Sequence, residues 1–102
     1  MKILFASDIS FNYFPEYPGD EAAEKAFSKT AEEFRKVDFF IFYLENILGN
    51  KADYEPIEKS GPNLIAEDSF IKYIDILNPT AVGLANNHTR DFGEGAMFHT
   101  MD

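Results

Sequence analysis

The sequence predicts an α/β fold built on a parallel β-sheet with right-handed crossovers. Three short apolar runs, at residues 2–7, 38–44 and 80–85, lack the alternation of a half-exposed strand. Two segments between these runs have the spacing of amphipathic helices, and a third helix is expected after the last run. Strands that alternate with helices pair in parallel, and their crossovers are right-handed in nearly all proteins.

The first half of the chain predicts a strand, a helix and a second strand. Residues 2–7 (KILFAS) should form a strand buried on both faces, with Asp8 at its carboxyl end, followed by a loop that contains Pro15 and Pro18. Residues 20–36 have apolar positions at helical spacing, acids at the start and two basic residues at the end. Residues 38–44 (DFFIFYL) predict the second buried strand.

The second half begins with a long loop at residues 47–63, which has two glycines, two prolines and no periodicity. Loops of this length are usually functional or mobile. Residues 66–77 predict a helix that Asn78 and Pro79 end, residues 80–85 predict the third strand, and a helix should follow Gly93.

Composition and charge exclude several classes of protein. A net charge of −9 disfavours binding to nucleic acid or to an anionic membrane. The longest apolar run has six residues, far short of the roughly 20 of a membrane span, and the start of the chain lacks the apolar segment of a signal peptide. Because there is also no cysteine, we expect a cytoplasmic chain without disulfides.

Polar residues follow the three predicted strands, where open parallel sheets bind their ligands. Asp8 ends the first strand, Glu45 follows the second, and Asn87 and His88 follow the third. Carboxylates, a carboxamide oxygen and an imidazole are suitable ligands for Mn²⁺, Fe, Mg²⁺ or Zn²⁺. We assign Asp8, Glu45 and Asn87 as metal ligands and His88 as the general acid for a leaving oxygen.

Structural interpretations remain open for each of these residues. An Asp at a strand end often caps a helix or forms a turn, and His88 could simply bond a backbone carbonyl. The pair Asn86–Asn87 could form a tight turn.

We assign Asn46 and Asn86 to substrate binding and Asp91 to orienting His88, and we interpret His99 as structural.

Three elements together resemble the CapA family of capsule and poly-γ-glutamate biosynthesis proteins, which is related to the calcineurin-like metallophosphoesterases. They are Ser7-Asp8, the Tyr43-Leu-Glu-Asn46 element with Pro56-Ile57 after it, and the stretch LANNHTRDFG at residues 84–93. The last element is the most specific of the three. Ser10 stands where many calcineurin-like enzymes have a His, and Tyr43 stands where the family commonly has Asn.

The resemblance implies a layered α/β/β/α fold with a metal site. Asp8 and Glu45 match acidic ligands of the family, Asn87 matches its Asn ligand, and His88 matches the catalytic His of the superfamily. Because such proteins carry further His motifs on later strands, we expect residues 1–102 to be one domain, the N-terminal portion of a larger domain and inactive alone. Its uncovered apolar faces then predict a homo-oligomer.

The function expected from the resemblance is capsule or poly-γ-glutamate biosynthesis, with metal-dependent hydrolysis of a phosphate ester or a polyanionic polymer. The alternative is a non-catalytic binding or assembly component of polymer synthesis and export. A third interpretation is a small α/β domain whose polar residues at the strand ends only cap helices.

Overall fold

The central sheet has three parallel strands. The computed structural model describes residues 1–11 and 21–102, so the loop predicted around Pro15 and Pro18 lies outside the described residues. Strands β1 (Ile3–Ile9), β2 (Phe39–Leu44) and β5 (Ala81–Gly83) pair in the order β1-β2-β5. The predicted α/β class with a parallel sheet is therefore confirmed.

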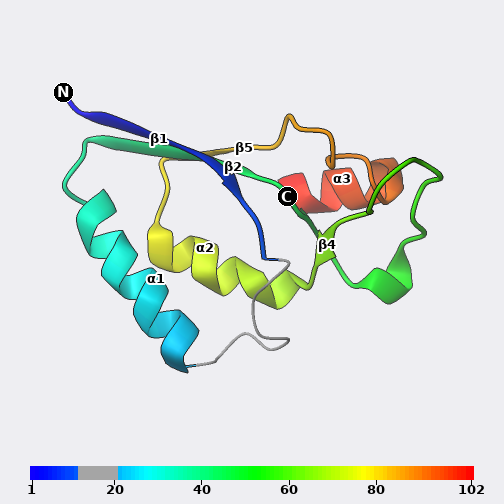
Figure 1. Cartoon of the computed structure of the whole chain (residues 1–102), viewed down its shortest axis with the longest axis horizontal. Helices are drawn as coiled ribbons and strands as arrows, with labels where there is room; N and C mark the ends of the chain where they lie inside the picture. Colours follow the sequence, from blue (N-terminus) through cyan, green and yellow to red (C-terminus); the bar gives the residue numbers. More distant parts are fainter. Residues whose placement is uncertain (12–20) are drawn as a thin grey trace.

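Two helices lie on the same side of this sheet (Figure 1). Helix α1 (Glu21–Phe34) falls within the predicted helix, and the two basic residues after it lie just beyond its last turn. Helix α2 (Ile71–Leu77) ends at Asn78, whose left-handed conformation (φ 49°) stops the helix as predicted. Its start differs from the prediction, because a 3₁₀ turn (Asp68–Phe70) precedes it.

The segment predicted as one long loop contains secondary structure of its own. Strand β3 (Ile47–Leu48) pairs in parallel with β4 (Ile65–Ala66), and a 3₁₀ turn (Lys51–Asp53) follows β3. The prediction of one loop over residues 47–63 was wrong at residues 47–48 and 51–53, and Ala66, predicted as the start of a helix, lies in β4. Strands of two residues are too short to produce a periodic pattern, and only their pairing across the fold defines them.

Aromatic residues dominate the core between the sheet and helices α1 and α2. Phe42 and Tyr73 are 0% and 1% exposed, and Phe11 lies with its ring centroid 5.1 Å from that of Phe70. Phe27 of α1 stacks on Tyr73 of α2 at 4.8 Å. Each such ring contributes on the order of 2 kcal/mol by leaving water, so the two helices are held to the sheet mainly by apolar burial.

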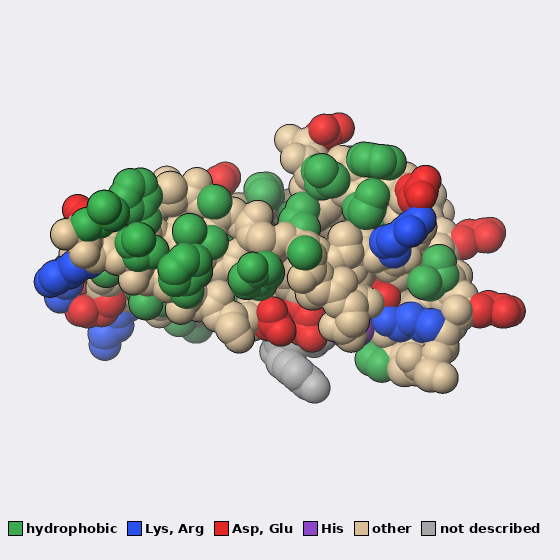
Figure 2. Space-filling view, turned by 90° about the horizontal axis from the view of Figure 1, so that it is seen from above, with side chains coloured by type: hydrophobic (Ala, Val, Ile, Leu, Met, Phe, Trp, Pro, Cys, Tyr) green, Lys and Arg blue, Asp and Glu red, His purple; other side chains and the backbone are tan. Residues whose placement is uncertain are grey.

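The other face of the sheet is open. The side chains of Ile3, Phe5, Phe39 and Tyr43 are 52%, 67%, 42% and 42% exposed, and apolar side chains gather over this face (green in Figure 2). The predictions that β1 is buried on both faces and that β2 is a second buried strand were therefore wrong, because both covering helices lie on one side. The homo-oligomer predicted from uncovered apolar faces stays a prediction.

A second, smaller lobe packs beyond the carboxyl end of the sheet. Helix α3 (Gly93–Met101), which begins at Gly93 as predicted, contacts β3 around a small cluster of Ile47, Phe92 and Ala96. The Leu48 N–H donates to Thr100 Oγ1 at 3.0 Å. Among the described residues, none of the helices is both long and apolar enough to cross a membrane.

Candidate functional site

The ends of β1 and β2 are aligned by one backbone bond, in which the Glu45 N–H donates to the Ile9 carbonyl at 3.0 Å. Glu45 follows β2 directly, as predicted. Asp8 is the second-to-last residue of β1, so it lies at the carboxyl end of that strand as predicted, and the register of β1 with β2 shifts between Ala6 and Ile9. Such a shift changes where side chains point along an edge strand. Asp8 is exposed at this position.

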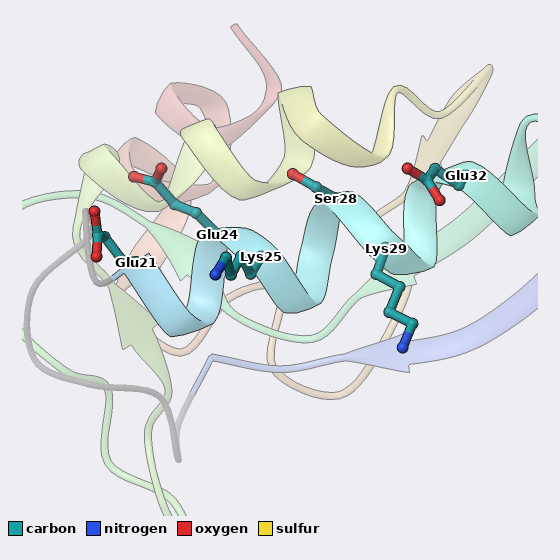
Figure 3. Close-up of a pocket in the computed structure, with 6 residues that line it drawn as sticks. All are labelled: Glu21, Glu24, Lys25, Ser28, Lys29 and Glu32. Atoms are coloured by element: carbon teal, nitrogen blue, oxygen red, sulfur yellow. The ribbon is translucent and has the colours of Figure 1, made fainter.

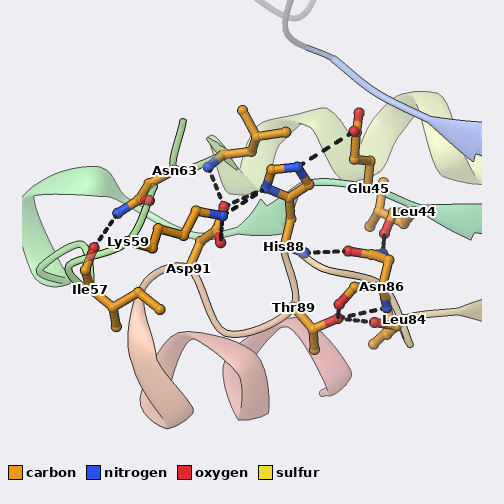
Figure 4. A network of polar contacts seen from close by, with 11 residues as sticks. Leu44, Glu45, Ile57, Lys59, Asn63, Leu84, Asn86, His88, Thr89 and Asp91 are labelled. Atoms are coloured by element: carbon orange, nitrogen blue, oxygen red, sulfur yellow. Dashed lines mark hydrogen bonds and ion pairs between the residues drawn. The ribbon is translucent and has the colours of Figure 1, made fainter. Parts of the chain in front are cut away.

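The turn after β5 is built by the side chain of Asn86 (Figure 4). Its Oδ1 accepts from the His88 N–H at 2.8 Å, and its Nδ2 donates to the Leu44 carbonyl at 2.7 Å. The Thr89 hydroxyl closes the same turn on the carbonyls of Leu84 and Asn86. Asn86 therefore joins the turn that carries His88 to the end of β2, which carries Glu45.

The imidazole of His88 lies between two carboxylates (Figure 4). Nδ1 is 2.6 Å from Asp91 Oδ2, and Nε2 is 3.7 Å from Glu45 Oε1. A carboxylate at 2.6 Å accepts the Nδ1 proton, so Nε2 is the nitrogen left to face Glu45. The side chain of His88 is only 9% exposed. Its Nε2 atom faces Glu45, the residue that follows β2.

Asp91 is a buried hub of hydrogen bonds. It is 1% exposed and accepts from Lys59 Nζ at 2.5 Å on Oδ1 and from the Leu64 N–H at 2.7 Å on Oδ2. Burial by itself raises the pKa of Asp91. The hydrogen bonds from Lys59, His88 and Leu64 outweigh burial and hold this pKa below its usual value. Asp91 is therefore a stable anion beside His88.

Lys59 was missed by sequence reasoning. It lies between Glu58 and Ser60 in the long segment before β4 that has no periodicity, and only the fold brings it to Asp91. Its side chain is 20% exposed. The one available signal was its place in a long loop expected to be functional, where Lys51 is the other lysine.

The remaining predicted residues are placed apart from this network. Asn46 is 1% exposed, and its Oδ1 accepts from the Phe11 N–H at 2.8 Å, so in this conformation it holds two chain segments together. Asn87 is exposed. His99 pairs with Asp68 on the surface, with Nε2 2.8 Å from Oδ1. The substrate contacts predicted for Asn46 and Asn86 stay predictions.

The donors for a metal ion are of the right kind but few in number. Glu45 and His88 Nε2 face one another, yet in the described part of the chain no three His, Asp or Glu side chains lie close enough together to hold an ion. The Ser10 hydroxyl is buried and has no hydrogen-bond partner among the described residues. Asp8 and Asn87, both exposed, would have to complete the set.

A large open hollow lies elsewhere, along the outer side of α1 (Figure 3). It has a volume of about 680 Å³ and is lined by Glu21, Glu24, Lys25, Ser28, Lys29 and Glu32. Among the described residues, all six lining side chains come from one helix. Ligand sites usually take side chains from several elements, and the side chains around His88 come from the end of β2, the turn after β5 and the segment before β4.

The fold and the site define an α/β protein with a buried Asp–His pair and a facing carboxylate at the carboxyl edge of a parallel sheet. A family model described as bacterial capsule synthesis protein PGA_cap matches residues 2–102. The chain therefore belongs to the PGA_cap family of bacterial capsule synthesis proteins, which confirms the family predicted from the motifs. No curated protein is similar enough to count as a match.

Proposed function

We propose that this capsule synthesis protein is a hydrolase of a phosphate ester or a polyanionic polymer, with His88 as its general acid. The observation that supports this proposal most is the orientation of His88. Asp91 holds Nδ1 at 2.6 Å, and Nε2 faces Glu45 at 3.7 Å. An imidazole fixed on one side by a buried carboxylate and directed outward on the other is suited to proton transfer.

His88 has a simple task in such a reaction. It donates the Nε2 proton to the oxygen that leaves, while Asp91 keeps the ring in one orientation and stabilises the imidazolium form. The buried Asp91 carboxylate stays ionised because three donors surround it, so it does not compete for the proton. Asn86 keeps the His88 turn against β2 through its two hydrogen bonds.

The same proposal includes a divalent ion, Mn²⁺, Fe, Mg²⁺ or Zn²⁺, held by Asp8, Glu45 and Asn87. When bound, the ion supplies an activated water and positive charge for a phosphate oxygen. These ligand types suit such ions, and a chain of net charge −9 needs a local cation to accept an anionic substrate.

Hydrolysis of a generic phosphodiester by the full-length protein with added Mn²⁺ tests the proposal. We expect His88→Ala to lower kcat by about 10² to 10⁴, the usual contribution of a general acid. Asn87→Ala should raise the Mn²⁺ concentration needed for turnover, because it removes a proposed ligand of the ion. His99→Ala is the matched control, because this surface His pairs with Asp68 and lies in α3, away from the His88 turn. Turnover that survives unchanged in His88→Ala would contradict the proposal.

A second candidate is a non-catalytic component that binds or assembles the polymer. The observation in its favour is that only Glu45 and His88 face one another among the candidate donors of the described residues. Calorimetric titration with Mn²⁺ separates the two candidates. Metal or polymer binding without turnover supports the component, whereas turnover that requires both the ion and His88 supports the hydrolase.

A further inference from the structure

The segment of residues 57–64 reaches Asp91 at three points. The Ile57 N–H donates to the Asp91 carbonyl at 2.8 Å, Lys59 Nζ donates to Oδ1 at 2.5 Å, and the Leu64 N–H donates to Oδ2 at 2.7 Å. Asn63 Nδ2 bonds the Ile57 carbonyl at 2.8 Å and so closes the segment on itself. Figure 4 shows this segment on one side of His88 and Glu45 on the other.

Lys59 fixes the rotation of the Asp91 carboxylate. It occupies Oδ1, so Oδ2 is the oxygen that remains for His88 Nδ1 and the Leu64 N–H. Lys59 Nζ is also 3.4 Å from His88 Nδ1. Because both nitrogens carry protons toward the same carboxylate, they share Asp91 as an acceptor and do not bond each other.

Lys59 also balances the charge of the hub. A carboxylate that is 1% exposed requires a partner charge or several donors, and Lys59 is the lysine that contacts it. Ile57 and Leu64, whose main-chain N–H groups donate to Asp91, lie on either side of Lys59 in the sequence. The Lys59 ammonium and these two amides therefore fasten residues 57–64 to Asp91.

We propose that Lys59 is a positioning residue: through Asp91 it fixes the orientation of the His88 ring and docks residues 57–64 beside it. Its effect on rate rests on the proposed hydrolase function. The docking of the segment and the orientation of the ring do not depend on that function. Lys59 itself need not touch the substrate, since its contacts are with Asp91 and the edge of His88.

Amide hydrogen exchange in the full-length protein tests the docking. Lys59→Met keeps the aliphatic stem and removes the charge, so the amides of Ile57 and Leu64 should exchange at least about tenfold faster. Lys59→Arg should restore most of the protection. Lys36→Met is the matched control, because in the described part of the chain the Lys36 ammonium pairs only with the exposed Glu33. Unchanged exchange at both amides in Lys59→Met would overturn the proposal.

The His88 ring gives a second readout that a purely structural lysine would not move. In the wild type the Nδ1 proton should give a strongly downfield NMR signal, because it lies in a 2.6 Å contact with a carboxylate. We expect this signal to shift or broaden in Lys59→Met and to return in Lys59→Arg. If Lys59→Met fails to fold, Lys59→Gln replaces it, with an intermediate change expected and an unchanged signal counting against the proposal.

Kinetics separate this proposal from the hydrolase proposal. Where the protein hydrolyses a phosphodiester, Lys59→Met should lower kcat with little change in KM, because His88 is misoriented while substrate contacts remain. Absence of turnover in every variant, with the exchange and NMR differences intact, would refute the hydrolase alone. Normal exchange and a normal Nδ1 signal in Lys59→Met would refute the positioning role alone.

Discussion

The main body and the small lobe of this protein are stabilised in different ways. Among the described residues, twelve buried apolar residues form the core under the sheet, whereas the cluster between α3 and β3 has only three, Ile47, Phe92 and Ala96. The small lobe is stabilised instead by hydrogen bonds that Lys59 and the Leu64 N–H donate to the buried Asp91 carboxylate. A lobe with little apolar burial can thus be held by a fully bonded carboxylate, which also makes it sensitive to charge.

Removing an aromatic ring from the main body should have the largest effect on stability. Phe42 is 0% exposed in the middle of β2, so Phe42→Ala should lower the free energy of unfolding by about 3 to 5 kcal/mol. Denaturant titration measures this loss. Phe98→Ala serves as the control because Phe98 is 56% exposed, and an equal loss in both variants would contradict the importance of the core.

Asp91→Ala should have the next largest effect, about 3 kcal/mol, because it leaves Lys59 and His88 without their buried acceptor. We expect the damage to concentrate in the small lobe. Hydrogen exchange should therefore increase at Ile57 and Leu64 more than in α1. A loss of protection spread evenly over both regions would show that the two are not stabilised separately.

The stabilisation by Asp91 should depend on pH. Its pKa is lowered in the folded protein relative to about 3.9 in an unfolded chain, so the contribution is full above about pH 4 and is lost as pH falls through the folded pKa. Asp91→Asn lacks this titration. Urea unfolding of both proteins between pH 3 and 7 should show their difference shrinking on the acidic side. A constant difference would contradict the charged state of Asp91.

Gly83→Ala should have a smaller effect, about 1 to 2 kcal/mol, at the open face of the sheet. A Cβ there would lie 2.5 Å from Cε1 of the Tyr43 ring, which stands beside Gly83 on the neighbouring strand. Tyr43 is 42% exposed and has room to move away. Thermal unfolding of the double variant with Tyr43→Ala should recover most of the loss. A double variant less stable than Gly83→Ala would argue against this contact.

The sequence predicted the elements with strong patterns. Helix α1 has apolar positions at helical spacing, and Asn78 and Gly93 mark where helices end and begin. The pairing of β3 with β4 was missed because two residues have no period. The open face was missed because a run of apolar residues in β1 does not indicate which face a helix will cover.

The candidate site was also predicted only in part, because some of its contacts follow from local sequence order and others depend on how distant segments fold together. Glu45 and His88 meet because each follows one of two neighbouring strands, which the order of elements allowed us to expect. Asp91 contacts His88 from three residues further along the same turn. Lys59 was missed because its position depends on how a long irregular segment folds back, and no local pattern encodes that path.

The most direct test is a comparison of kcat for the wild type, Asp91→Asn and His88→Ala at saturating phosphodiester and Mn²⁺. We expect the wild type to be fastest, Asp91→Asn about 10-fold to 100-fold slower because His88 loses its anionic partner, and His88→Ala slowest, with similar KM values. Equal rates in all three proteins, each shown to be folded, would contradict a reaction centre at His88.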